Sequence, residues 1–462
     1  MLQNRNGSSL QFSFGNALCL ISAFFAAIAL AVTVDLRPSE IVKTSYGVKW
    51  VPFEFFGLSG TLFLIFLCVQ LLKKNWPKIY IASIVMIGFA YLPYVTEISL
   101  FKSSDYKVYE SAANNVLQEK SIYNCKYLYP PLPAFLLAKV ISQNQSLAKS
   151  ILNKDYTEQR VLQLVYFQYQ AMQFFLALAC ALATIFLLHK QTSFSSTHIG
   201  LTCFLLFTVN QPLFRTFRHN QINFWVLLSM IFFILWRNNR PVFAGLSCCI
   251  GIHFKIFPII FLIPLFFKKK WQGLISLIFF LMISFIMPLV LSLPGSYMNE
   301  FLKSFEIFPQ GKTFRDNSIH SLCQNFFPFL TGLQFTMIYR VIFLGIILLF
   351  IYRCWSRAKF ISSETDELFY FLETTVFFML LSPLSWEHHY VFITPLLIFG
   401  IVGATDLKTS ITFIASTILC LFIPTFDVFP FSYHRISGLL LILFLAPMKT
   451  GEKTVLSDFV NA

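Results

Sequence analysis

Two adjacent histidines end a polar run, Ser-Pro-Leu-Ser-Trp-Glu-His-His at 382–389, that lies between two apolar stretches. An imidazole exchanges a proton near neutral pH and, when protonated, binds an anion. His388 and His389 are therefore candidates for holding a negatively charged group. Exposed loop histidines without a partner are the plain alternative, but a Trp, a Glu and two Ser in the same run make it the weaker interpretation.

A second basic group, Arg215, Arg218 and His219, precedes Gln221 and Asn223 at the mouth of another apolar stretch. Guanidinium and imidazole groups bind phosphate and stabilise the negative charge that develops when a bond to phosphate breaks. The amides of Gln221 and Asn223 donate and accept hydrogen bonds, so they can orient a polar substrate. Anchoring to lipid headgroups is the alternative for the two arginines.

Lys255 interrupts the apolar stretch near 241–267, together with His253 and Pro258. A pair of half-helices that enters and leaves the membrane on one side fits this pattern. Non-helical backbone survives at membrane depth only against protein or a water-filled cavity. Lys255 would then face a cavity, unless its side chain only extends toward the membrane surface.

Asp105 precedes a segment in which apolar residues recur at helical spacing from Val108 to Leu117. This pattern predicts an amphipathic helix on the membrane surface. A carboxylate at that place can act as a base toward a hydroxyl group, or it can simply cap the helix. Taken alone, the capping interpretation is favoured about two times in three.

The elements that must position these residues are membrane helices. Hydrophobic residues make up 56% of the 462 residues and charged residues only 12%, so lipid rather than water must cover the surface. Apolar blocks recur at the length of about 20 residues that crosses the hydrocarbon core. We expect an all-α, polytopic integral membrane protein with roughly 11 to 14 transmembrane helices.

The sequence shows no soluble domain and no repeat, so a single membrane domain is expected over 1–462. Asn317 stands in one of the two stretches outside the clear spans that are long enough to carry chemistry. The expected order is N-terminal spans in 1–97, an outer loop with the surface helix and a membrane re-entry in 98–160, central spans with broken helices in 161–292, a second outer loop in 293–330 and C-terminal spans in 331–462.

The net charge of +14 arises largely from basic residues in short loops, such as Lys268 to Lys270. By the positive-inside tendency these loops are cytoplasmic, and anionic membrane lipids, not nucleic acid, are their expected partners. Counting spans from them places the two outer loops and the run 382–389 on the non-cytoplasmic side. We therefore expect a multi-pass plasma-membrane protein with its site on that side.

The ten cysteines form no CxxC pair and no zinc-site spacing, and no paired-aspartate motif for a metal is present. We therefore expect no metal and no cofactor. Cys125 and Cys323 are the two that fall in predicted outer loops, and the sequence favours two unpaired thiols over a bridge between them.

Four passages resemble motifs of a known family. The most specific is 382–389, which resembles Ser-Pro-x-Ser-Trp-Asp-His-His with Glu387 in place of the aspartate. Asn220-Gln-Ile-Asn223 is similar to Gly-Gln-x-Asn, with Asn220 in place of the glycine. The other two are Ala244-Gly245 through Lys255-Ile-Phe-Pro258, and Asp105-Tyr-Lys-Val-Tyr109 followed by Tyr127-Leu-Tyr-Pro-Pro131, with Asn317-Ser318 as a weaker match.

In their order and spacing these passages resemble glycosyltransferase family 87, membrane enzymes of the GT-C superfamily that include polyprenol-phosphate-mannose-dependent mannosyltransferases. The resemblance implies that a hexose, mannose being the first expectation, is transferred from a polyprenyl-phosphate-sugar donor to a lipid-linked or glycolipid acceptor. The transfer would need no metal and would invert the anomeric configuration. It implies that Asp105 is the base, which makes the capping interpretation the minority one. Arg215, Arg218, His219, Lys255, His388 and His389 would bind the phosphate, and Gln221, Asn223 and Asn317 would orient sugar hydroxyls.

Two other functions remain open from the sequence. A transporter or lipid flippase would also use broken helices and buried cations, although it should show two related halves and only one broken block is evident. A polysaccharide polymerase or ligase would also carry basic outer loops, but it would use an oligosaccharide on a lipid diphosphate.

Overall fold

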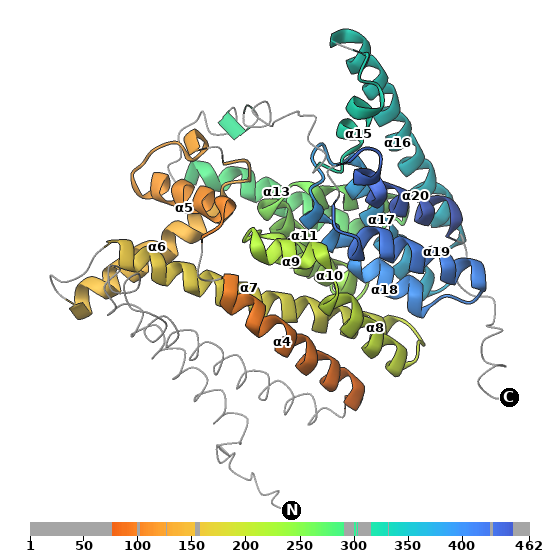
Figure 1. Cartoon of the computed structure of the whole chain (residues 1–462), viewed down its shortest axis with the longest axis horizontal. Coiled ribbons are helices and arrows are strands. Elements are labelled where there is room, and N and C mark those ends of the chain that lie inside the picture. The colour runs from red at the N-terminus through yellow and green to blue at the C-terminus, as the bar shows by residue number, and fades with distance from the viewer. Residues whose placement is uncertain are drawn as a thin grey trace, which may run out of the picture. The chain divides into compact units, whose positions relative to one another are not determined.

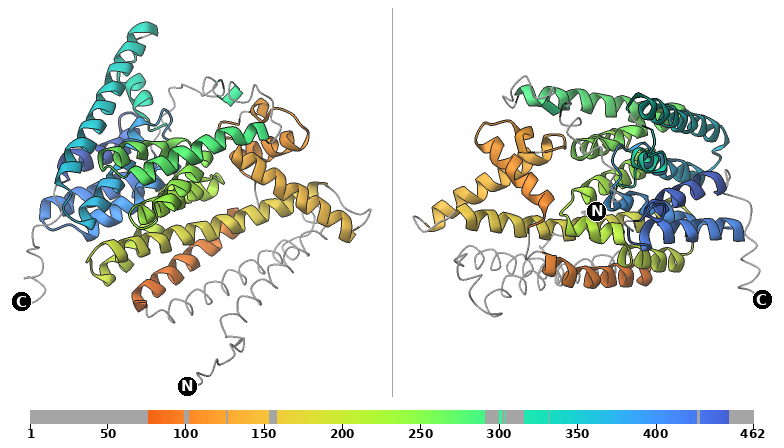
Figure 2. Two further views of the ribbon diagram at one scale, coloured as in Figure 1. Left: turned by 180° about the vertical axis from the view of Figure 1, so that it is seen from behind. Right: turned by 45° about the horizontal axis from the view of Figure 1, so that its top comes forward.

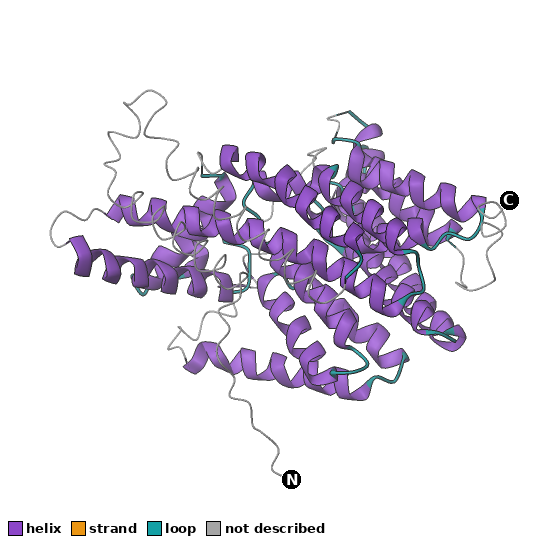
Figure 3. Cartoon of the chain, turned by 90° about the horizontal axis from the view of Figure 1, so that it is seen from below, coloured by secondary structure: helices purple, strands orange, loops and turns teal. Residues whose placement is uncertain are grey.

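The computed structural model describes residues 76–98, 102–125, 127–152, 158–290, 300–301, 303, 316–330, 332–425 and 428–446. Every regular element in these ranges is a helix, which confirms the all-α prediction (Figure 3). Within these ranges, Asp316 and Trp386 also form one isolated antiparallel β-bridge. Of the region 1–97, where N-terminal spans are expected, residues 1–75 lie outside the described residues.

By its internal contacts the chain divides into two compact units, 1–100 with 143–174 and 101–142 with 175–462. The first contains α4 (Lys78–Ile98) and the adjoining parts of α6 (Leu132–Leu152) and α7 (Glu158–Gln191). Within it, the side-chain amides of Asn144 and Gln168 exchange two hydrogen bonds of 3.1 Å. All the predicted site residues belong to the second unit.

In the second unit, helices far apart in the chain pack together; α18 (Thr394–Val402), for example, contacts α8 (Ser196–Thr208) (Figure 1). α10 packs against α11, and α11 packs against α13, which can be followed from behind in Figure 2. The elements are α5 (Ser104–Leu117), η1 (Ile122–Cys125), α8 (Ser196–Thr208), α9 (Gln211–Arg218), α10 (Asn223–Trp236), α11 (Pro241–Phe254), η2 (Phe257–Phe261), α12 (Leu262–Phe267), α13 (Trp271–Val290), α15 (Ile319–Phe326), α16 (Gly332–Phe360), α17 (Glu364–Leu381), η4 (Glu387–Ile393), α18 (Thr394–Val402), α19 (Leu407–Thr417), η5 (Ile418–Phe422), η6 (Phe431–Tyr433) and α20 (His434–Leu445).

Gly245 explains why α11 and α13 can approach closely. A Cβ atom at this position would lie 2.6 Å from Ser276 Oγ and 2.7 Å from the backbone nitrogen of Leu277. The second of these atoms belongs to the backbone of α13 and cannot move aside cheaply, so any larger residue would separate the helices. The Ala-Gly pair at 244–245 is thus a packing feature that fixes α11, the helix that ends at Lys255.

The predicted interruption of the apolar stretch near 241–267 is confirmed. α11 ends at Phe254, and Lys255 takes an extended backbone conformation before the short helix η2 begins. Pro258 lies in the first turn of η2, where its missing N–H leaves no hydrogen bond unmade. The break therefore places Lys255 between two helical pieces, where its side chain is buried.

The amphipathic helix predicted after Asp105 is confirmed as α5, but the interpretation of Asp105 as its cap is wrong. Ser103 is the N-cap, and its hydroxyl oxygen accepts a hydrogen bond of 3.1 Å from the backbone N–H of Tyr106. Asp105 lies in the first turn instead. Ser103 thus holds the capping position, and the carboxylate of Asp105 contacts Gln221 instead.

Two of the described helices, α7 and α16, are long and apolar enough to cross a membrane. Several shorter apolar helices in the described ranges do not reach that length, so the count of 11 to 14 spans stays a prediction. Cys125 and Cys323 are free thiols, which confirms the prediction that they do not pair.

Candidate active site

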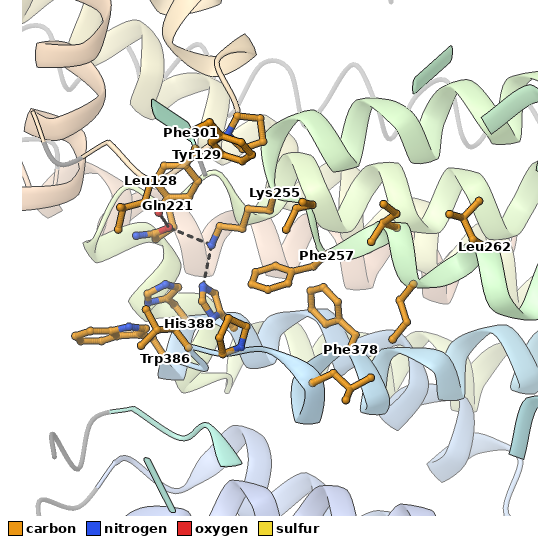
Figure 4. Close-up of a pocket in the computed structure, with 18 of the residues that line it drawn as sticks. Leu128, Tyr129, Gln221, Lys255, Phe257, Leu262, Phe301, Phe378, Trp386 and His388 are labelled. Atoms are coloured by element: carbon orange, nitrogen blue, oxygen red, sulfur yellow. Dashed lines mark hydrogen bonds between the residues drawn. The ribbon is translucent and has the colours of Figure 1, made fainter. Parts of the chain in front are cut away.

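A cavity of about 940 Å³ lies in the second unit and has two chemically different ends (Figure 4). One end is polar, and it is lined by Asp105, Tyr129, His219, Gln221, Lys255, Trp386, His388 and His389. The other end is apolar, and it is lined mainly by Phe257, Ile259, Ile260, Leu262, Ile263, Ile347, Phe350, Phe378 and Leu381. The cavity can therefore hold a molecule that has a charged head and a long hydrocarbon part.

The turn between α9 and α10 brings Gln221 into the cavity. Asn220 adopts a positive φ of 56°, in the left-handed region that glycine enters most readily and that asparagine tolerates better than most other residues. The backbone N–H of Gln221 then donates to the carbonyl of Thr216 over 3.0 Å. The asparagine that replaces the motif's glycine thus keeps the tight turn.

Lys255 is held by three acceptors. Its ammonium nitrogen lies 2.6 Å from Asn223 Oδ1, 3.4 Å from Gln221 Oε1 and 2.8 Å from His389 Nε2. An ammonium group has three protons and no acceptor site, so it can donate only, and the contact with Gln221 is the longest of the three. His389 must then accept through Nε2, which places its own proton on Nδ1 and leaves its ring neutral.

The polar run 382–389 is fixed by hydrogen bonds to its backbone. Asn223 Nδ2 donates to the carbonyl of His388 over 2.8 Å, and the hydroxyl of Thr216 donates to the same oxygen over 3.2 Å. On the other side, the buried carboxylate of Asp316 accepts from the backbone N–H of Ser385 over 2.9 Å. The rings of His388 and His389 lie 4.5 Å apart between centroids and are both part of the cavity wall.

Asp105 reaches the same place from α5. Its carboxylate Oδ2 accepts a hydrogen bond from Gln221 Nε2. The start of α5 is also tied to the α9–α10 turn, because the hydroxyl of Ser103 donates to the carbonyl of His219 over 2.7 Å. The predicted base and the predicted cation Lys255 therefore both contact Gln221.

Burial lowers the pKa of His219 below its usual value; Asp105 and Glu387 oppose this effect, while Arg215 and Arg218 add to it. The neutral imidazole is therefore favoured near neutral pH. His219 lines the cavity as a hydrogen-bonding group more than as a resident cation.

Four predicted site residues do not line the cavity: Arg215, Arg218, Asn223 and Asn317. Asn223 is buried behind the wall and contacts Lys255. Arg215 forms an ion pair with Glu387, with 3.4 Å between Nε and Oε2, and its side chain is 37% exposed. Arg218 is exposed on α9. Asn317 is buried, and its backbone N–H donates to the carbonyl of Ser385 over 2.8 Å, so it helps to hold the polar run from behind.

Two residues that matter to the site were missed in the sequence. Asp316 pins the backbone at Ser385, and Arg435 of α20 donates from Nη2 to Glu387 Oε1 over 2.9 Å. The side chain of Arg435 is fully buried. An arginine inside an apolar block near the C-terminus was the available signal, because an ionised group at that depth requires a partner.

Among the described residues, no group of three or more His, Cys, Asp or Glu side chains is arranged to hold a metal ion. The polar end of the cavity instead combines one carboxylate, one ammonium and three imidazoles. Such a set can remove a proton from a hydroxyl at one point and hold an anion at another.

A model of glycosyltransferase family 87 matches residues 127–383, more than half of the chain. The chain belongs to glycosyltransferase family 87. This confirms the resemblance found in the motifs and makes the protein a membrane-associated glycosyltransferase of the GT-C-like group. The comparisons with curated proteins and with solved structures gave no match.

The family 87 match covers Tyr129, Gln221 and Lys255 but begins after Asp105 and ends before the two histidines. The cavity nevertheless joins all of these residues. In the described structure, α5 and η4, which carry residues outside the matched segment, thus line the same cavity as residues within it.

Proposed function

We propose that this glycosyltransferase moves a hexose, specifically mannose, from a polyprenyl-phosphate-sugar donor to a lipid-linked or glycolipid acceptor. The transfer inverts the anomeric centre and takes place on the non-cytoplasmic side of the plasma membrane. The observation that carries the proposal is the two-ended cavity, whose polar end holds Asp105 and Lys255 and whose other end is apolar. A lipid-phosphate-sugar has the same division into a charged head and a hydrocarbon tail.

The phosphate of the donor would bind at Lys255, with His388 and His389 beside it. Lys255 is buried, and its hydrogen-bonding partners are neutral groups, so its positive charge is available to an anion. Charge interactions are stronger in a buried site than in water. Negative charge that develops on the leaving phosphate would be stabilised there.

The prenyl tail would occupy the apolar end, which η2, α12, α16 and α17 line. Ile347 and Phe350 come from α16, most of whose apolar side chains are exposed. Removal of a tail's CH₂ groups from water contributes about 0.8 kcal/mol for each group. The apolar end of the cavity therefore supports a lipid-linked donor over a water-soluble sugar nucleotide.

In the reaction, the acceptor hydroxyl would attack the anomeric carbon from the face opposite the phosphate. The bond from the acceptor oxygen to the anomeric carbon forms as the bond from that carbon to the phosphate oxygen breaks. The acceptor proton passes to Asp105, and the bonding electron pair leaves with the phosphate. A single displacement of this kind inverts the anomeric configuration.

The membrane arrangement belongs to the same proposal. A multi-pass chain with 11 to 14 spans and outward-facing loops is supported by the recurring apolar blocks and by the basic clusters in short loops. Labelling of single cysteines introduced into 102–125 and into 268–270 with an impermeant reagent would test it. Labelling of 102–125 from the cytoplasmic side would contradict the proposal.

Replacement of Asp105 by asparagine tests the role of the base. Purified protein in detergent or nanodiscs would be assayed with a polyprenyl-phosphate-mannose donor and a glycolipid acceptor. We expect a loss of about 10²- to 10⁴-fold in turnover, because the amide cannot accept the hydroxyl proton. Undiminished turnover would remove Asp105 from the mechanism, and competition by a lipid diphosphate but not by the monophosphate would favour a polymerase or ligase.

A further inference from the structure

Gln221 makes contacts at both ends of its side-chain amide and is 2% exposed. Its oxygen Oε1 accepts from the hydroxyl of Tyr129 over 3.1 Å, from the hydroxyl of Tyr109 over 3.4 Å and from Lys255 Nζ over 3.4 Å. Its nitrogen Nε2 donates to the carboxylate of Asp105. The amide is therefore the junction between the base and the cation.

The orientation of this amide is fixed by the chemistry of its neighbours. The ammonium group of Lys255 can only donate, so it must meet the oxygen of Gln221. Carboxylate oxygens accept hydrogen bonds, so the oxygen Oδ2 of Asp105 meets the nitrogen. If the amide were rotated by 180°, its NH₂ group would face the ammonium of Lys255 and its oxygen would face the carboxylate of Asp105. Two donors and two acceptors would then meet, so this orientation is disfavoured.

We propose that Gln221 is a positioning residue that keeps Asp105 and Lys255 joined but separate, and this inference rests on the proposed function. A direct ion pair between the two would neutralise the base and would force the donor phosphate to displace a carboxylate from the lysine. A neutral amide between them contacts both side chains and adds no charge next to either of them. The assignment differs from the sugar-orienting role that the sequence suggests for Gln221.

Titratable side chains from three neighbouring elements face Asp105 in the described part of the chain. Lys255 at the end of α11, His219 after α9 and Tyr129 before α6 all interact with it electrostatically. Lys102, just before α5, pairs with Glu110 of α5 over 2.6 Å. A carboxylate placed at position 221 would add a negative charge directly next to Asp105.

The variant Gln221→Glu tests the proposal with almost no change in shape. The new carboxylate can still accept from Lys255, Tyr129 and Tyr109, but it places a second negative group against Asp105. Two adjacent carboxylates share a proton, so the pair keeps that proton to a higher pH than a lone carboxylate does. The charge arrangement at the base changes, whereas the packing does not.

The primary measurement is the pH dependence with which a hydrophobic carbodiimide labels Asp105, since this reagent attacks protonated carboxyl groups. Peptide mass spectrometry separates Asp105 from position 221. We expect the labelling midpoint at Asp105 to rise by about one pH unit or more in Gln221→Glu. Gln191→Glu is the matched control, because Gln191 is a buried glutamine that accepts from Arg237 and lies outside the cavity lining.

Enzyme kinetics provide the second measurement. In Gln221→Glu the acid limb of the pH profile of kcat should move upward with the labelling midpoint. The KM for the donor should also rise, because the new carboxylate faces Lys255 as well as Asp105. A labelling midpoint that does not move overturns the positioning role. A higher acceptor KM with an unchanged pH profile also overturns it, in favour of direct sugar binding.

The labelling experiment needs no turnover, so it separates this inference from the proposed function. A wild-type protein that transfers no sugar from the lipid-phosphate donor would contradict the proposed function alone. The midpoint shift at Asp105 would still decide whether Gln221 controls the carboxylate. A lower yield of folded Gln221→Glu with an unmoved midpoint would assign the residue a purely structural role.

Discussion

The polar end of the cavity and the junction of α16 with α17 both bury cations, but they satisfy them in different ways. Lys255 is held by neutral acceptors, two amide oxygens and one imidazole nitrogen. Arg357 and Arg353 instead bind the buried carboxylate of Glu373, over 2.7 Å and 3.0 Å. A buried charge with neutral partners remains available to an anionic ligand, whereas a charge paired with a carboxylate is already neutralised.

The same rule separates other parts of the second unit. Arg237, whose side chain is fully buried, pairs with Glu367, which also binds Lys270 over 3.0 Å. Arg435 pairs with Glu387 immediately before the two histidines. These carboxylate-bound cations hold helices and loops together, and Lys255 is the contrasting case at the site.

The largest expected difference between the two regions comes from replacing each cation by methionine. Lys255→Met should lower transfer by about 10²- to 10³-fold, because the leaving phosphate loses its buried cation. Arg357→Met should lower the free energy of unfolding by up to about 3 kcal/mol, because Glu373 keeps only Arg353 as a partner. Activity per folded molecule and thermal unfolding in detergent measure the two effects.

The comparison would fail if the two variants behaved alike. If the Lys255→Met variant loses stability but its folded fraction keeps normal turnover, Lys255 has a structural role only. If the Arg357→Met variant folds normally but does not bind the donor, the binding site must include residues of α16 and α17.

A smaller effect on activity is expected when Lys255 is given a carboxylate partner, as Arg357 and Arg237 have. Asn223→Asp gives Lys255 a carboxylate partner at the shortest of its three contacts, 2.6 Å in the present structure. The donor phosphate must then compete with a resident anion, so we expect the KM for the donor to rise about tenfold. Donor titration under single-turnover conditions would measure it.

Asn223→Asp also removes the amide that donates to the carbonyl of His388. Asn223→Ser is the control, because it removes both amide contacts without adding charge. A donor KM that rises equally in both variants would show that the hydrogen bond to His388, and not the competing charge, is the cause.

The helical architecture and the individual polar motifs could be predicted from the sequence because each depends on local spacing. The break at Lys255 follows from a lysine and a proline inside an apolar stretch, and α5 follows from helical periodicity. The family motifs also brought Asp105 into the candidate site. These signals are properties of short segments, which the amino-acid pattern records directly.

The partners of the charged residues could not be predicted, because pairing depends on which distant helices meet. Arg215 was expected at the phosphate but lies against Glu387, and Glu387 is shared with Arg435, 48 residues later in the chain. Asp316 holds the backbone of Ser385 across 69 residues. No local pattern specifies such contacts, since they follow from tertiary packing.

The smallest expected effect concerns the turn that aims Gln221 between the two charges. Asn220→Ala and Asn220→Gly remove the same buried amide group, so their difference isolates the cost of the positive φ at this position. The alanine variant should be about 1 kcal/mol less stable than the glycine variant, because a Cβ atom disfavours the left-handed region. In the alanine variant we also expect a lower kcat with little change in the donor KM, because a displaced Gln221 would release Asp105 while Lys255 keeps Asn223 and His389 as partners. Chemical denaturation and kinetics of the two variants side by side measure both differences, and equal values would show that the turn does not aim Gln221.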